Sequence, residues 1–147
     1  MYKAVNIFIA GACFYEDIAA DLINGACEAL DSADAQYEVF KVPGAFELPC
    51  AVRIAINSGK FDGYVALGCV IRGETSHYDY VCAESARGLM ELSVNYGIAL
   101  GYGILTTENM EQARVRASRT GSNKGASSAN VCLKMIDLQR RLTNEID

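Results

Sequence analysis

The sequence predicts an α/β domain in which a four-stranded parallel sheet lies between two layers of helices, and three observations support this prediction. Short apolar runs alternate four times with segments whose apolar residues recur every three or four positions, as on one face of a helix. The connections between successive runs are too long for hairpins, so crossovers must join the strands in parallel. The chain of 147 residues, 51% of them hydrophobic, suits a single domain over residues 1–147.

The first strand is predicted over residues 5–10, an apolar run closed by Gly11 and typical of a strand buried on both faces. A helix follows, because Glu16 and Asp17 favour a helix start and apolar residues then recur at helical spacing. These apolar residues are Ile18, Leu22, Ile23, Ala26 and Leu30. The second strand is predicted over residues 37–42.

Pro43 and Gly44 then interrupt the chain, and a second helical stripe ends at Gly59, a residue suited to a C-terminal cap. The apolar residues of this stripe are Leu48, Ala51, Val52, Ala55 and Ile56. A turn at Asp62 leads into the third predicted strand, which covers residues 64–67 and extends slightly beyond them.

The third helix is expected over about residues 78–96, and residues 99–105 form the fourth strand. Thr106 and Thr107 are predicted to cap a helix over about residues 108–117. A last helix carries on one face Ala129, Leu133 and Ile136. These repeats predict a flavodoxin-like three-layer α/β/α sandwich.

The composition excludes some classes of function. The net charge of −5 argues against general nucleic-acid binding. No apolar run is long enough to cross a bilayer and no signal peptide precedes the first strand, so we expect a cytoplasmic protein without membrane contact. Residues 112–136 contain no acidic residue, which suggests an anionic ligand or partner or, alternatively, a solvated helix face paired with acids elsewhere. The basic residues there are Arg114, Arg116, Arg119, Lys124 and Lys134.

The cysteines are scattered and indicate reduced, mostly packed thiols. The chain has six of them without a CxxC pair, and its one histidine cannot complete a usual zinc set by proximity, so no metal is expected. A nucleophilic Cys69 or Cys82 activated by His77 is the alternative, although no sequence signature supports it.

Four loops are candidates for a ligand site, because open parallel sheets bind ligands beyond the carboxyl ends of their strands. These loops cover residues 11–17, 42–49, 68–77 and 106–109. His77, the only histidine, lies in the third loop, and an ordinary pKa of about 6.5 suits proton transfer near neutrality. The alternative is a surface histidine at a helix start.

Other residues in these loops suit the binding of a ring and an anion. Phe14 and Tyr15 are placed to stack on a flat heterocycle; alternatively, Phe14 plugs the sheet edge. Two prolines stiffen residues 42–49, and a rigid loop with one carboxylate, Glu47, suits hydrogen bonding to a polyol or to the edge of a ring. Alternatively, Glu47 is an acidic residue favoured at a helix N-terminus by the helix dipole. Gly73 and Thr75 precede a helix N-terminus, which favours an anion site.

Four motifs resemble, in order and spacing, those of the lumazine synthase family: VPGAFELP, ALGCVIRGETSHYDYV from residue 66, GILTTENMEQA from residue 103, and GSNKG. The resemblance covers residues 5–142. It implies a transferase that condenses 5-amino-6-(D-ribitylamino)uracil with 3,4-dihydroxy-2-butanone 4-phosphate to 6,7-dimethyl-8-ribityllumazine. Phosphate and water are released in this penultimate step of riboflavin biosynthesis, and no cofactor is needed.

The resemblance also implies roles for residues that match the family motifs. His77 is the expected proton donor. Lys124 is expected to add positive charge to the region that binds the substrate phosphate. The residues expected to bind the butanone phosphate are Glu74, Thr75 and Arg116. Those expected to bind the pyrimidine and ribityl groups are Phe14, Ala45, Phe46, Glu47, Cys69, Val70, Ile71 and Tyr102. Tyr102 and Arg116 would reach the site from a neighbouring subunit.

The family resemblance further implies a homopentamer, either alone or within a decamer or a sixty-subunit shell, and an association with riboflavin synthase. Because the sequence begins close to its first predicted strand, we expect no N-terminal extension of the kind that adds a strand to the neighbour in many members. It also departs from common family residues at Cys13, Tyr15, Ser76 and Tyr102, which bear on substrate affinity more than on reaction type.

Two other functions compete with this interpretation. A binding or shell-forming paralogue would keep the pyrimidine pocket without catalysis, but the presence of Thr75, His77 and Arg116 together disfavours it. A flavodoxin-like receiver or flavin carrier is disfavoured because the strand ends lack an acidic cluster and the chain has no tryptophan to flank a flavin.

Overall fold

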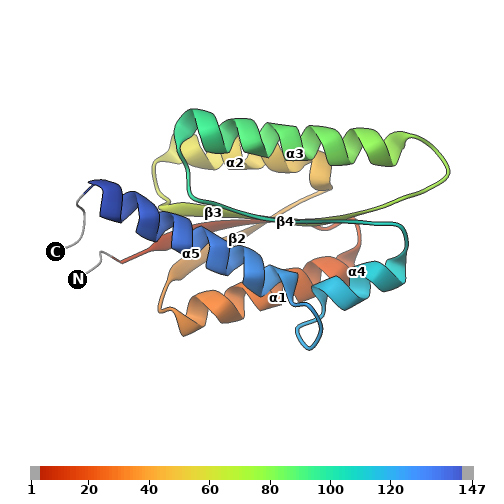
Figure 1. Cartoon of the computed structure of the whole chain (residues 1–147), viewed down its shortest axis with the longest axis horizontal. Coiled ribbons are helices and arrows are strands. Elements are labelled where there is room, and N and C mark those ends of the chain that lie inside the picture. Colours follow the sequence, from red (N-terminus) through yellow and green to blue (C-terminus); the bar gives the residue numbers. More distant parts are fainter. Residues whose placement is uncertain (1–3, 144–147) are drawn as a thin grey trace.

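The computed structural model describes residues 4–143, and within them strands and helices alternate around one sheet (Figure 1). The strands are β1 (Asn6–Ala12), β2 (Gln36–Val42), β3 (Gly63–Ile71) and β4 (Leu100–Thr107). The helices are α1 (Glu16–Ser32), α2 (Leu48–Ser58), α3 (His77–Tyr96), α4 (Met110–Ala117) and α5 (Lys124–Thr143), with a short 3-10 turn, η1, at Ala45–Glu47.

The sheet has the strand order β2-β1-β3-β4, and all three strand pairs are parallel. Helices α2 and α3 cover one face, whereas α1, α4 and α5 cover the other (Figure 1). Each face has its own core: Ile9, Leu22 and Cys132 belong to one, and Phe8 and Leu48 to the other. The predicted three-layer α/β/α sandwich with a four-stranded parallel sheet is therefore confirmed.

All the predicted elements are present, but several boundaries differ from the sequence-based expectation: β1 extends to Ala12 rather than ending at residue 10, and β4 ends at Thr107 rather than at residue 105. β3 extends beyond residue 67, as expected, and ends at Ile71, because it is paired with β4 up to the Ile71–Thr107 rung and stays buried through Val70. The prediction that Thr106 and Thr107 cap the fourth helix is wrong, since both belong to β4. Asn109 is the cap, and its side-chain oxygen accepts a hydrogen bond from Gln112 N at 2.9 Å.

The glycines of β4 allow α5 to lie close to the sheet. A Cβ atom at Gly101 would collide with the backbone oxygen of Ser128 on α5, and one at Gly103 would meet the Ser128 hydroxyl at 2.5 Å. This hydroxyl donates a hydrogen bond to the carbonyl oxygen of Lys124 at 2.8 Å.

Among the described helices, none combines the length and hydropathy that crossing a bilayer requires.

We expect Gly101→Ala to lower the free energy of unfolding by about 1–3 kcal/mol, because the added methyl group meets helix backbone that cannot rotate away. Urea unfolding at matched protein concentration measures the change. Gly73→Ala is the control, since a Cβ atom there has no neighbour within 4 Å. Equal stability of both variants would show that α5 shifts without penalty.

Candidate active site

A cavity of about 550 Å³ lies beyond the carboxyl ends of β1, β2 and β3, where the topology of parallel sheets favours ligand binding. We call it the first pocket. Loops that are distant in the sequence meet there: the β1–α1 loop, η1, the end of β3 and the turn before α3. The residues singled out from the sequence that line it are Phe14, Ala45, Phe46, Glu47, Cys69, Val70, Ile71, Gly73, Thr75 and His77.

Two aromatic rings lie exposed at this pocket. The Phe14 side chain is 73% exposed and packs edge-on against Tyr15, with ring centroids 5.0 Å apart. Phe46 on η1 is 59% exposed. The alternative in which Phe14 plugs the sheet edge is therefore wrong, because a plug would be buried. Exposed rings beside an apolar cavity are suited to stacking on a flat ligand.

Glu47 supplies the carboxylate of the first pocket. Pro49 lies in the first turn of α2, and Glu47 directly precedes this helix at the N-cap position. Its side chain is exposed and makes no capping hydrogen bond to the helix. The carboxylate, at the positive end of a helix dipole, is thus oriented to accept hydrogen bonds from a ligand's hydroxyl or amide groups.

His77 is the first residue of α3, at the open side of the first pocket. Its backbone N–H donates to the Thr75 hydroxyl at 3.3 Å, while Ser76 occupies the N-cap without a side-chain capping bond. The residues of the turn, from Gly73 to His77, are exposed. Glu74 belongs to this turn but is not among the residues that line the pocket. Unpaired N–H groups at a helix start favour an anion.

The thiols near the first pocket are poor nucleophiles. Burial raises the pKa of the Cys69 thiol to about 11, and burial also raises the pKa of Cys82. Both side chains are therefore neutral near pH 7, which argues against the hypothesis of a thiolate activated by His77. All six cysteines are unpaired; Cys50 is exposed, whereas the other five are buried or partly buried, as the sequence predicted for most of them.

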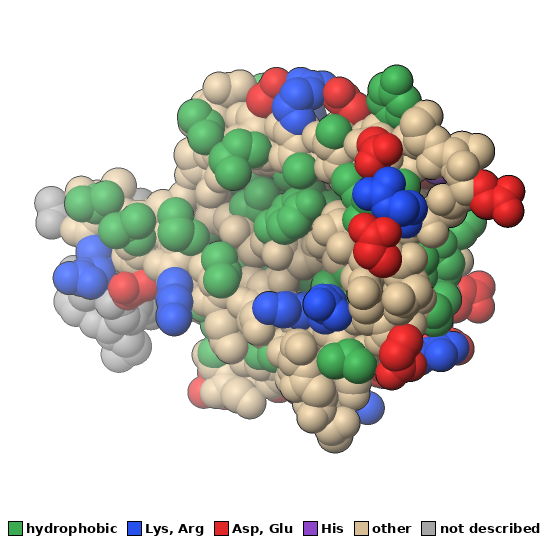
Figure 2. Space-filling view, turned by 45° about the vertical axis from the view of Figure 1, so that its right-hand side comes forward, with side chains coloured by type: hydrophobic (Ala, Val, Ile, Leu, Met, Phe, Trp, Pro, Cys, Tyr) green, Lys and Arg blue, Asp and Glu red, His purple; other side chains and the backbone are tan. Residues whose placement is uncertain are grey.

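A second pocket, of about 340 Å³, lies along edge strand β4 and the start of α5. It contains three residues singled out from the sequence, namely Tyr102, Arg116 and Lys124. The Arg116 guanidinium donates to the backbone oxygen of Gln112 at 3.0 Å and forms no ion pair within residues 4–143. Figure 2 shows basic side chains beside an apolar patch on this side of the molecule.

The basic segment therefore serves different purposes at different positions. Arg119 forms an ion pair with Glu28 on α1. This contact agrees with the alternative expectation, in which the basic residues of this segment pair with acids elsewhere in the chain. Arg116 and Lys124 instead face a cavity, which favours an anionic ligand. The two pockets share no lining residue, so one chain does not bring Arg116 to His77.

A family model described as 6,7-dimethyl-8-ribityllumazine synthase matches residues 4–140. The chain belongs to the lumazine synthase family. It is 50% identical to 6,7-dimethyl-8-ribityllumazine synthase 1 of Rhizobium meliloti, with 97% of each chain covered. A lumazine synthase of Bartonella tribocorum is 49% identical over 96% of this chain and 94% of its own, and one of Agrobacterium fabrum is 47% identical over 93% and 96%.

Two residues that line the first pocket, Tyr78 and Val81, were not singled out from the sequence. Tyr78 and Val81 line it from the first turns of α3. The available signal was an aromatic residue directly after His77. Tyr15, which the sequence places with Phe14 in the loop after the first strand as a ring able to stack on a ligand, also lines the first pocket. Pro43, one of the two prolines expected to stiffen its loop, lines it from the segment after β2.

We expect iodoacetamide to modify Cys50 well before Cys69 and Cys132 in the folded protein at pH 8. Cys50 is exposed, whereas burial raises the pKa of Cys69 to about 11 and that of Cys132 to about 12, so few of their thiols ionise. Peptide mass spectrometry gives the order of modification, and unfolded protein serves as the control for equal reactivity. Equally rapid modification of Cys69 would revive the thiolate hypothesis.

Proposed function

We propose that the chain condenses 5-amino-6-(D-ribitylamino)uracil with 3,4-dihydroxy-2-butanone 4-phosphate to 6,7-dimethyl-8-ribityllumazine, releasing phosphate and water. This transferase reaction is the penultimate step of riboflavin biosynthesis. The names of the relatives state the same product, and they cover nearly the whole chain. The observation that carries the proposal is that His77 shares a pocket with exposed aromatic rings and an anion-binding turn.

The first pocket is proposed to hold the pyrimidine. Phe14 stacks on the ring, and Phe46 covers it from η1. Ala45 contributes a small side chain, and Glu47 accepts hydrogen bonds from the ribityl hydroxyls. The apolar wall behind the ring is the end of β3, at Cys69, Val70 and Ile71.

The butanone phosphate is proposed to bind between the turn before α3 and a basic pair. Thr75 offers a hydroxyl, and the turn that includes Glu74 offers backbone N–H groups at a helix start. Arg116 makes a charge-assisted contact with the phosphate, supported by Lys124 and bordered by Tyr102. A guanidinium and an ammonium stabilise the phosphate as it leaves.

His77 is proposed to shuttle the proton. Imine formation between the pyrimidine amine and the ketone expels water, elimination expels phosphate, and ring closure expels a second water. Each step moves a proton to or from oxygen or nitrogen, which an imidazole does in both directions near neutral pH. Holding two reactants together supplies much of the acceleration, so we do not expect His77 to be indispensable.

We propose that the site is completed by a second copy of the chain in a homopentamer. The two pockets of one chain hold complementary parts of one site without sharing a residue, which supports an arrangement in which neighbours exchange them. A stripe of apolar side chains with 39–76% exposure also runs along α5 and suits burial against another subunit. It consists of Val131, Met135, Leu138 and Leu142.

The remaining expectations belong to the same proposal. We propose one domain over residues 1–147, a cytoplasmic location in which the phosphorylated substrate is available, and an association with riboflavin synthase, which consumes the product. The pentamer either stands alone or builds a decamer or a sixty-subunit shell. Mass measurement in solution distinguishes these assemblies.

Mixing the protein with both substrates is expected to form the lumazine chromophore at a rate far above the uncatalysed background. Absorbance during the first minutes measures this rate. Heat-unfolded protein at the same concentration is the control. A rate equal to that control, with tight binding of the ribitylated pyrimidine, would instead identify a non-catalytic binding paralogue.

Co-expression of two impaired variants is expected to restore activity if neighbours share a site. One variant is Arg116→Ala, and the other carries Phe14→Ala with His77→Ala. In mixed rings, about a quarter of the sites combine an intact first pocket with an intact Arg116. The purified hybrids are compared with the two variants expressed separately and then pooled. Equal activity of hybrids and pooled variants would place the whole site within one chain.

A further inference from the structure

Arg72, the first residue beyond β3, connects three elements while lining neither pocket. Its backbone N–H donates to Thr107 O at 3.0 Å, which continues the pairing of β3 with β4. Its Nε donates to Glu108 Oε2 at 2.8 Å, beyond the end of β4, and its Nη1 donates to Asp79 Oδ1 at 3.3 Å, in the first turn of α3. One guanidinium therefore joins the ends of two strands to the start of a helix.

The same guanidinium lies over the ring of Tyr78, with its central carbon 4.3 Å from the ring centroid. A cation at this distance from an aromatic face is attracted by the ring quadrupole. Tyr78 lines the first pocket and directly follows His77. Burial is the chief cause that raises the pKa of its phenol, and the Tyr78 side chain packs, partly buried, against the core cluster that contains Leu48 and Val81.

The turn from Gly73 to Ser76, which lies between Arg72 and α3, forms few hydrogen bonds. From Gly73 to Ser76 the backbone is exposed, and within residues 4–143 its hydrogen bonds join it only to the start of α3. The position of His77 relative to the pocket therefore depends on how the first turn of α3 is attached to the strand ends. Val81 is buried in the core on this face, and Arg72 adds an attachment to the strand ends through Tyr78 and Asp79.

We propose that Arg72 is a positioning residue for the proton transfer by His77, through the stack on Tyr78 and the paired carboxylates of Glu108 and Asp79. This inference rests on the proposed function. The fork of a guanidinium meets two carboxylates while its plane covers a ring, and the ammonium of lysine lacks that geometry. A displacement of about 1 Å at a reacting group lowers rates substantially.

Arg72→Lys tests this role because it keeps the charge and removes the stack and the fork. We expect kcat for lumazine formation to fall about tenfold, with the affinity for the pyrimidine, measured by fluorescence titration, and the unfolding midpoint nearly unchanged. The ion pairs involve side chains that are 42–60% exposed, so their contribution to stability is small. Glu108→Gln, which leaves Arg72 in place, is expected to produce a smaller fall in kcat.

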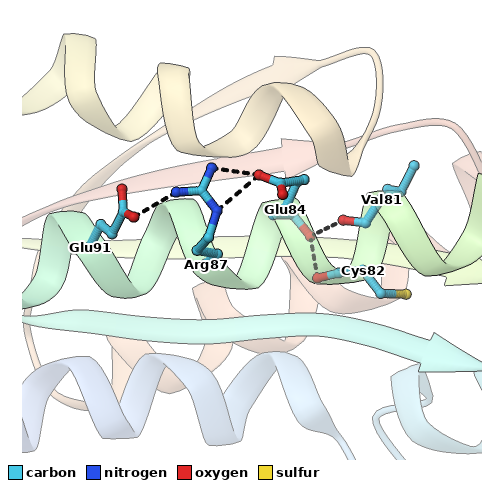
Figure 3. Close-up of polar contacts among 6 residues, drawn as sticks. Val81, Cys82, Glu84, Arg87 and Glu91 are labelled. Atoms are coloured by element: carbon cyan, nitrogen blue, oxygen red, sulfur yellow. Dashed lines mark hydrogen bonds and ion pairs between the residues drawn. The ribbon is translucent and has the colours of Figure 1, made fainter.

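Arg87→Lys is the matched control. Arg87 lies on α3 between Glu84 and Glu91, to which its Nε and Nη1 donate at 2.9 and 2.5 Å (Figure 3). Like Arg72 it bridges two carboxylates, but both belong to its own helix and it lines neither pocket. We expect wild-type kcat for Arg87→Lys.

A double-mutant cycle separates positioning from general damage. If Arg72 acts through His77, Arg72→Lys lowers kcat little or not at all in a His77→Asn background. Additive losses, or a loss of pyrimidine affinity equal to the loss of kcat, would overturn the proposal. So would wild-type kcat in Arg72→Lys, provided that the wild-type protein forms lumazine. Absence of lumazine formation by the wild type would instead refute the proposed function.

Discussion

The burial of β3 between β1 and β4 is the constraint on which the rest of the structure depends. β3 is paired on both sides, and its side chains are buried from Gly63 to Val70. A strand in this position cannot shift by one residue without turning its core side chains to the opposite helix layer. Its carboxyl end is therefore held in place, and with it the apolar wall of the first pocket, Arg72 and the turn that leads to His77.

The two pockets show how the same sheet places chemistry at two different edges. The first pocket uses the strand ends near the centre of the sheet, whereas the second lies along edge strand β4. Glycines at 101 and 103 bring α5 close to that edge, where Lys124 begins the helix. Packing of α5 thus determines where the basic group lies, and it leaves the stripe of Val131, Met135, Leu138 and Leu142 exposed.

Parts of the fold and site were predictable because they depend on local patterns. Alternating strand and helix periods identify the three-layer sandwich, and parallel strands bring the loops that carry Phe14, Glu47 and His77 to one edge. The cap of α4 was not predictable in this way, because Thr107 and Asn109 are both good caps and the pairing of β4 with β3 decides between them. The same pairing decides that β3 ends at Ile71, where the sequence predicted only an end somewhat beyond residue 67.

The sequence by itself determined the fold class, the family and the candidate loops, since periodicity and motif order are properties of the chain that do not require its folded form. Only the tertiary structure decided that Arg116 and His77 of one chain lie in separate pockets, and that Phe14 is exposed rather than a plug. It also decided that Arg72 meets Tyr78, Asp79 and Glu108. The reason is that such contacts depend on the packing of elements far apart in the sequence, which local patterns do not specify.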